Sequence, residues 1–141
     1  MWADTYTKLK DILEDAGFTQ CTELFDFENN PKGVQHKAFM ILAPDMTQGK
    51  EIRDINAEIY RIQKVQILIG YVLNTVNNLT VHNQIPTDIE GLSLDFDDNT
   101  NIPTGAIWMR FVDSKTRRMD ENLNTYIQVE INLELLQVYS L

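Results

Sequence analysis

The chain has 141 residues, with 12 Lys and Arg against 21 Asp and Glu, and a formal net charge of −9. Its length suits one domain with its own core, and 43% hydrophobic residues argue against disorder. The acidity disfavours a duplex-DNA-binding module, which needs clustered cations, and the single Cys21 excludes a disulfide framework or a multi-cysteine zinc site. We expect no membrane span, because no apolar stretch approaches ~20 residues, and no signal peptide, so that synthesis takes place in the cytoplasm.

The first segment has the pattern of an amphipathic helix. Apolar residues recur at helical spacings of three and four: Trp2, Tyr6, Leu9, Leu13 and Ala16. We expect Asp4 or Thr5 to cap the start of this helix by accepting free backbone N–H groups. Gly17 can adopt the left-handed conformation that commonly ends a helix, and we expect Phe18 to contact the last turn.

The next region predicts a buried strand between two connections. The apolar run Ala38–Ala43 has the length and composition of a central strand that is buried on both faces. Before it, a short apolar segment at Leu24–Phe27 is followed by Asn, Pro and Gly residues at 29–33, which indicate a turn. After it, we expect a loop over Asp45–Lys50.

The segment from Ile52 to Leu73 allows more than one interpretation. The isoleucines of Ile52–Ile62 fit a helical stripe, whereas the later apolar residues recur at every second position: Val65, Ile67, Ile69, Tyr71 and Leu73. Fully extended, Ile55–Leu73 spans roughly 60 Å, while a domain of this size has a radius of gyration of about 14 Å. We favour a long strand that bends near Arg61–Lys64, with an outward arm or a helical first half as alternatives.

The C-terminal half begins with a polar stretch and ends in strands. Asn74–Asn101 contains several turn signals and only a weak pattern for one short helix, at Ile89, Leu92 and Phe96. Ala106–Val112 predicts a strand, and Asp113–Asn124 a charged, exposed connection.

The last segment gives the clearest strand signal in the chain. Apolar and polar residues alternate in two sets: Ile127, Val129, Ile131, Leu133 and Leu135 against Gln128, Glu130, Asn132 and Glu134. We therefore expect one α+β domain over residues 1–141. Its sheet is mixed and mostly antiparallel, and the N-terminal helix, with the optional second short helix, packs on one face.

Local motifs do not point to an enzyme. The three serines, Ser93, Ser114 and Ser140, lie in no nucleophile motif, and Cys21 is interpreted as a small hydrophobic residue rather than as the partner of His36. The six glycines form no phosphate-binding loop. We expect no catalytic residue, no metal and no cofactor.

The acidic run at residues 95–101 resembles the first half of a calcium loop. Asp95, Asp97 and Asn99 stand at the first, third and fifth positions. Thr100 stands where such a loop needs Gly, however, and Ala106 where it needs Glu. We interpret the run as a solvated acidic turn.

The order of these segments resembles the lambda-type tail terminators of long-tailed bacteriophages, the neck proteins that cap the tail tube. The resemblance follows the segments Tyr6–Ala16, Leu24–Phe27, Ala38–Ala43, Glu58–Leu73, Ala106–Val112 and Thr125–Leu135. It covers nearly the whole chain as a succession of elements, without a residue motif. Its weakest part is Asn74–Asn101, where the family usually has a substantial helix.

The resemblance implies a structural virion protein that is synthesised in the host cytoplasm. It implies a homo-oligomer, typically a hexameric ring, that stops polymerisation of the tail tube protein and joins the tube to the head–tail connector proteins. DNA would pass through the ring without specific binding, and no membrane would be involved. On this basis Asp95, Asp97 and Asp98 are candidates to face the channel. The candidates for contact with a neighbouring subunit or a partner are Arg117, Arg118, Tyr60, Ile62 and Val65.

Three alternatives stay open at this point. The nearest is another phage neck or tail component, such as a head-completion or tail tube protein. A second is a small enzyme or ligand-binding domain. The third is an acidic inhibitor that mimics DNA, which ranks last because only Glu130 and Glu134 lie on the polar side of the final strand.

Overall fold

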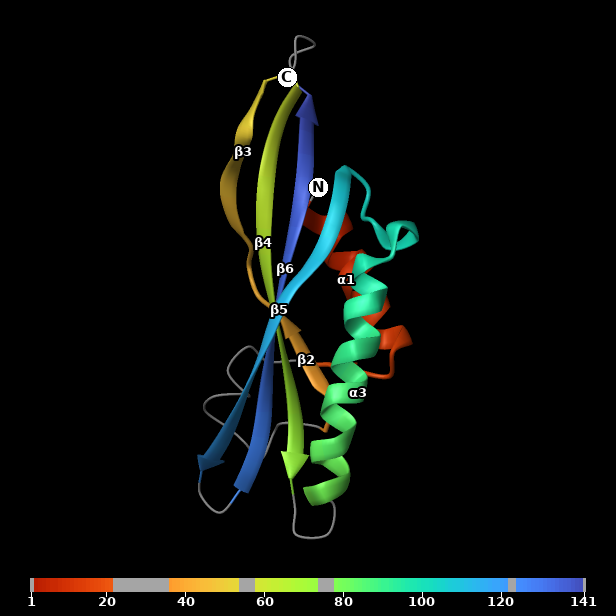
Figure 1. The fold of residues 1–141 in the computed structure, drawn as a ribbon, viewed down its shortest axis with the longest axis vertical. Helices are drawn as coiled ribbons and strands as arrows, with labels where there is room; N and C mark the ends of the chain where they lie inside the picture. The colour runs from red at the N-terminus through yellow and green to blue at the C-terminus, as the bar shows by residue number, and fades with distance from the viewer. Residues whose placement is uncertain (1, 22–35, 54–57, 74–77, 122–123, 141) are drawn as a thin grey trace.

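Two long antiparallel strands, β4 and β6, run the length of the molecule, and the other elements are arranged around them (Figure 1). The computed structural model describes residues 2–21, 36–53, 58–73, 78–121 and 124–140. Its elements in chain order are α1 (Trp2–Asp15), β1 (Thr19–Gln20), β2 (Ala38–Ile41), β3 (Asp45–Arg53), β4 (Glu58–Leu73), α3 (Asn78–Asp97), the 3₁₀ helix η2 (Asn99–Asn101), β5 (Ala106–Glu121) and β6 (Asn124–Ser140).

The strands form one sheet in the order β1-β2-β4-β6-β5, and β3 pairs with β4 beyond the end of β2. Strands β1 and β2 are parallel, and the other pairs are antiparallel. Both α1 and α3 lie on one face of this sheet (Figure 1). The predicted α+β class, with a mixed, mostly antiparallel sheet and helices on one face, is confirmed.

The long strand predicted through Glu58–Leu73 is present as β4, and its ladder with β6 runs without a register shift from Glu58–Ser140 to Leu73–Thr125. The change of apolar phase near Arg61–Lys64 therefore produces no bulge in β4. Instead, Gln63 takes a core-facing position that an apolar residue would otherwise hold. Ile52 belongs to β3, so the described part of Ile52–Ile62 is strand rather than helix, and residues 54–57 lie outside the described residues.

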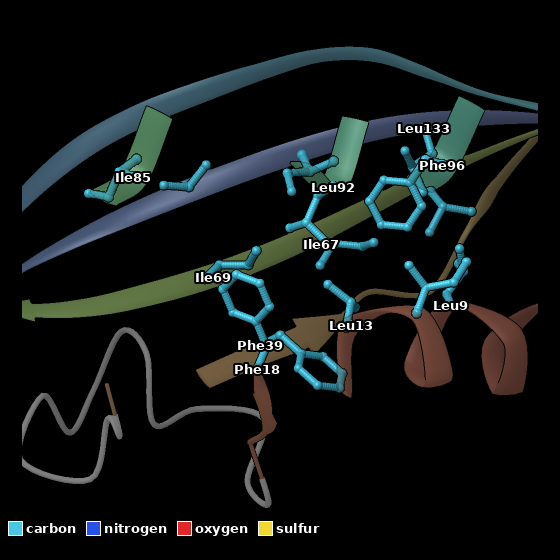
Figure 2. Packing of buried hydrophobic residues seen from close by; sticks show 14 of the residues in the cluster. Leu9, Leu13, Phe18, Phe39, Ile67, Ile69, Ile85, Leu92, Phe96 and Leu133 are labelled. Atoms are coloured by element: carbon cyan, nitrogen blue, oxygen red, sulfur yellow. The ribbon is translucent and has the colours of Figure 1, made fainter. Parts of the chain in front are cut away.

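The core lies between the helices and the face of the sheet that carries the odd-numbered residues of β4 and β6. Figure 2 shows Leu9 and Leu13 of α1 and Leu92 and Phe96 of α3 converging on this face, where Ile67 is fully buried. Each fully buried side chain of this size stabilises the fold by about 1.5–3 kcal/mol relative to leaving it exposed. The predicted apolar face of β6 is confirmed, because all five of its residues are buried: Ile127, Val129, Ile131, Leu133 and Leu135.

The first helix is confirmed, but its cap is not where the sequence predicted it. Because α1 begins at Trp2, Asp4 and Thr5 lie inside its first turns rather than before them. Gly17 does adopt the left-handed conformation, with φ +93°, and Phe18 is buried. The segment Leu24–Phe27 and the turn at 29–33 lie outside the described residues.

Two predictions about the connections were wrong, and the short helix predicted at Ile89, Leu92 and Phe96 is present but longer than expected. The expected loop Asp45–Lys50 is part of β3, where pairing with β4 outweighs the polar composition. The polar stretch Asn74–Asn101 contains the 20-residue α3, because a stripe of apolar residues packs it on the sheet even though Pro86 lies within it. In the charged segment Asp113–Asn124, residues 113–121 continue β5 as a strand and Asn124 begins β6, although the side chains at 113–118 are exposed as expected.

A small polar network lies between α1 and the sheet. The fully buried amide nitrogen Nε2 of Gln137 donates to Thr5 Oγ1 at 3.2 Å and to Gln63 Oε1 at 3.0 Å. The other amide atom, Gln137 Oε1, is buried without a hydrogen-bond partner. The network fixes the helix against the sheet, but it stabilises the fold less than an apolar contact of equal size would.

Replacing Gln137 alone should cost more than replacing the whole network. Gln137→Leu leaves the buried acceptor of Gln63 unpaired, so we expect a loss of about 1–3 kcal/mol in the free energy of unfolding. The triple variant Thr5→Val, Gln63→Leu, Gln137→Leu removes all the polar atoms and should recover most of that loss. Urea denaturation compares the two, and a triple variant less stable than Gln137→Leu would contradict this account.

Two glycines should respond to alanine with opposite signs. At Gly17 the added Cβ meets only Lys37 Nζ, at 3.8 Å, but the positive φ makes Gly17→Ala destabilising by about 1 kcal/mol. Gly91 lies in α3 with nothing within 4 Å of a new Cβ, so Gly91→Ala should stabilise by about 0.5–1 kcal/mol. If both substitutions shift the denaturation midpoint by the same amount, the positive φ of Gly17 does not determine its response.

Candidate interaction surface

A group of titratable side chains lies where α3 meets the start of β2 and the end of β4. The Tyr71 hydroxyl donates to Asp88 Oδ2 at 2.9 Å, and Lys37 Nζ lies 3.6 Å from the same carboxylate oxygen. Lys37 Nζ also sits 4.6 Å from the centre of the Phe18 ring. The His36 ring meets Tyr71 edge-on, and its Nδ1 accepts the backbone N–H of Val72 at 3.2 Å.

This group fastens α3 to the sheet. Burial raises the pKa of the Tyr71 hydroxyl, and its hydrogen bond to Asp88 adds to the rise, so the group is a poor nucleophile or base. Burial, followed by the nearby Lys37 cation, lowers the pKa of His36, whereas Asp88 opposes this shift. The neutral imidazole is the form that can accept the Val72 hydrogen bond.

The acidic run at the end of α3 caps backbone groups. Asp97 Oδ1 accepts the backbone N–H of Phe111 at 2.8 Å. Asp98 accepts both the N–H and the hydroxyl of Thr100, and these bonds lower the pKa of the Asp98 carboxyl. Asp95 contributes its backbone carbonyl to Asn101 Nδ2. The described residues contain no group of three or more His, Cys, Asp or Glu side chains placed to hold a metal ion.

The predicted contact residues divide between the core and the surface. Val65 is only 1% exposed and packs under the helices, so it is not available to a partner. Tyr60 and Ile62 are half-buried on the opposite face of β4, which neither α1 nor α3 covers. Arg117 and Arg118 are exposed on the distal part of β5, and register places them on opposite faces of the sheet.

The side of the sheet away from the helices, called here the open face, carries a hydrogen-bonded polar surface beside β3 and β5, whereas Leu68, Tyr126 and Gln128 on the same side are buried. Gln66 Nε2 donates to Glu130 Oε1 at 3.2 Å, and Asn132 Nδ2 donates to Asp113 Oδ1 at 2.6 Å. Beside these groups is a shallow hollow of about 260 Å³ whose polar lining includes Asp45 and Lys64. Its volume lies below the range of about 300–1,000 Å³ that is usual for small-ligand pockets.

Two edge residues that sequence reasoning did not select stand out in the structure. The Arg110 guanidinium bonds Glu134 Oε1 at 3.0 Å and stacks 4.8 Å from the centre of the Trp108 ring. Both Arg110 and Trp108 lie in β5, which pairs only with β6 among the described strands. The signal that could have found them is the alternation Trp108, Arg110 in a predicted strand, which places an aromatic ring and a cation on one face.

Acidification should weaken the fold through His36. Because the folded-state pKa is below the ordinary 6.5, the native state binds fewer protons than the unfolded state. Stability is therefore full above pH 6.5 and falls as the pH drops below it. His36→Asn keeps an acceptor for Val72 and should flatten the dependence of the denaturation midpoint between pH 7.5 and 5.5. His82→Asn, at an exposed position of α3, is the control and should retain the wild-type slope.

Comparison with known proteins identifies no relative. No protein-family model matches the chain, and no curated protein matches it. In the part of the chain that the structure describes, no helix is long and apolar enough to cross a membrane.

Proposed function

We propose that this chain is a subunit of a closed ring, and that the ring is the tail terminator of a long-tailed bacteriophage. The observation that carries the proposal is that β3 and β5 are the outer strands in the half of the sheet that contains β3. Strands β3, β4, β6 and β5 lie side by side there, and each pair is antiparallel.

Four alternating strands leave two edges that run in opposite directions. Strand β3 pairs only with β4 and β5 only with β6 among the described strands, so both keep one unpaired side. A second copy related by a simple rotation brings its β3 beside β5 of the first in antiparallel orientation. Such head-to-tail contacts are heterologous, and they form a ring when the rotation closes.

The arrangement of elements also supports the terminator rather than a ring of another kind. The order of an N-terminal helix, a group of strands, a helix and two long strands follows the order that the resemblance implies. The 20-residue α3 supplies the substantial helix that the polar composition of Asn74–Asn101 had not predicted. The weakest part of the resemblance is thereby strengthened.

The ring would present two faces of different charge. On the open face the described charges balance, with Lys64, Arg110, Lys115 and Arg117 against Asp45, Asp113, Glu130 and Glu134. Among the described residues, the excess negative charge lies on the helix side, where α1, α3 and the turn with Asp95, Asp97 and Asp98 are found. If these three carboxylates line the channel and repel DNA phosphates, the helix side must face the axis.

The remaining contact candidates suit the other partners of a terminator. Tyr60 and Ile62 lie on the end of the open face beyond the helices, a half-buried apolar surface for the tail tube protein. Arg117 and Arg118 lie at the opposite end of the molecule, on the distal part of β5, and suit an acidic surface of a connector protein. Both assignments belong to the proposal.

Light scattering coupled to size exclusion tests the ring. We expect a particle of about 98 kDa, six times the 16.3 kDa chain, and ring-shaped images in negative stain. When the tail tube protein of the same phage is added, the rings should sit at one end of the tubes and limit their length.

Other outcomes would reject the terminator. A chain that stays monomeric at high concentration, with and without tube protein, rules out the ring. Long tubes formed by this chain alone would identify a tail tube protein instead. Rings that join connector proteins but leave tube length unchanged would identify a head-completion protein.

A further inference from the structure

We propose that the ring contact is one defined edge pairing, in which β5 of one copy binds β3 of a second copy with Trp108 opposite Thr47, Met109 opposite Met46 and Arg110 opposite Asp45. This inference rests on the proposed ring and names its interface. Four features of the two edges fit this register.

The first feature is a row of alternating charges that crosses the whole sheet. Asp45 of β3 is the register partner of Lys64 in β4, Lys64 is the partner of Glu134 in β6, and Glu134 is the partner of Arg110 in β5. Register partners share one face of a sheet, so the signs alternate from one edge to the other. The row ends in a carboxylate at β3 and in a guanidinium at β5. A second copy in the same register continues the alternation, with its Asp45 beside Arg110.

The second feature is that Arg110 is already held in place at the edge. It lies between the carboxylate of Glu134 and the ring of Trp108, while 57% of its side chain remains exposed. A guanidinium has five N–H donors, so the bond to Glu134 leaves donors for a second carboxylate. Asp45 is exposed, and it forms no ion pair within the described residues.

The third feature is the direction of the backbone groups. The N–H of Phe111 points away from β6, because it bonds Asp97, and alternate residues of a strand point the same way. The N–H and C=O of Met109 therefore also point outward. At the β3 edge, the direction follows from β4. The carbonyls of Gln66 and Gly70 point toward β2, and alternate residues of a strand point the same way, so the backbone groups of Lys64 point toward β3. They pair there with the backbone groups of Asp45. Met46 is then the residue of β3 whose backbone groups point outward. Met109 and Met46 of two copies can exchange a pair of hydrogen bonds.

The fourth feature is the exposed apolar surface at the same rows. Met46 is 46% exposed. Its register partner in β4 is Gln63, the partner of Gln63 in β6 is Leu135, and the partner of Leu135 in β5 is Met109, at the other edge. In the proposed register, Met46 of the second copy lies beside Met109 on the helix side. On the open face, Thr47 of the second copy meets Trp108. The contact thus covers one of the few large apolar side chains that the described surface exposes.

The pairing has a defined end. At Phe111 the outward N–H is already capped by Asp97, and the residue of the second copy that would lie opposite is Pro44, which has no N–H to donate. The ladder therefore stops one residue beyond the Arg110–Asp45 pair. A short ladder of this kind fixes the register between subunits by its side chains rather than by its length.

Charge reversal in separate and mixed samples tests the pairing. Arg110→Glu and Asp45→Arg each place like charges across the contact, so each variant alone should need a protein concentration about tenfold higher or more for assembly. An equimolar mixture should assemble as the wild type does. In the mixture the new carboxylate of the Arg110→Glu chain meets the new guanidinium of the Asp45→Arg chain, and the two unchanged edges meet each other. The double variant should also assemble alone.

Matched controls separate the contact from the change of charge. Lys10→Glu also turns a cation into a carboxylate and breaks an exposed ion pair, to Glu14, but lies in α1. Glu90→Arg makes the same kind of reversal as Asp45→Arg at an exposed position of α3. Both controls should assemble as the wild type does. Circular dichroism confirms that each variant is folded.

A disulfide gives a second measurement that does not depend on charge. Because the backbone groups of Arg110 and Asp45 point toward their own sheets, the proposed pair is of the non-hydrogen-bonded type, with Cα atoms about 4.5 Å apart, within the range of a disulfide. Asp45→Cys with Arg110→Cys, in a Cys21→Ser background, should form a covalent ladder of subunits on oxidation. Either single cysteine variant should give no ladder.

The outcomes distinguish the interface from the proposed function. Wild-type rings with reversal variants that assemble normally, or a double cysteine variant without a ladder, overturn the register and leave the ring standing. A wild-type chain that never assembles overturns both. Impaired single variants, a restored mixture and a covalent ladder together support the pairing.

Discussion

The continuous ladder between β4 and β6 is the constraint on which the rest of the structure depends. Its sixteen residue pairs keep one register from Glu58–Ser140 to Leu73–Thr125. A slip of one residue would turn Ile67 and Ile131 away from the helices, and with them the whole buried face. The same register aligns Lys64 with Glu134 and so sets the row of charges across the sheet. One register therefore determines both the packing of the core and the charges at the sheet edges.

The elements that the sequence predicted well are those in which one face is buried along the full length. In α1 and β6 the periodicity of the sequence matches the burial, from Leu9 and Leu13 to Ile131 and Leu133. The second helix was underestimated because several of its residues face solvent and Pro86 interrupts the helical propensity. The stripe that anchors it becomes evident only when Val81 and Ile85 are placed on the same face as Leu92. The extension of β5 was missed because a strand that is exposed on both faces has no apolar alternation.

The candidate interface could be predicted only in part. The sequence indicated a long strand, with an outward arm as one alternative to a bend, and it selected Tyr60 and Ile62 on that strand. It could not show that Asp45, Lys64, Glu134 and Arg110 share one row, because such a row depends on the register of three separate strand pairings. It placed Val65 among the contact residues because alternation alone does not say which face of a strand the helices cover. Single residues at sheet edges are defined by topology more than by local pattern.

The outer sides of β3 and β5 could lead to aggregation, and only part of the β5 edge is protected against it. An exposed edge strand can bind any other chain through its free backbone groups, and charged side chains or local caps discourage such binding. The distal part of β5 carries Lys115 and Arg117, and Asp97 caps the N–H of Phe111. Between that cap and the start of β5, the outward groups of Met109 have no hydrogen-bond partner among the described residues. The proposed pairing would use this open stretch, because it lies beside the oriented Arg110 and would meet the edge of a second copy that begins with Asp45.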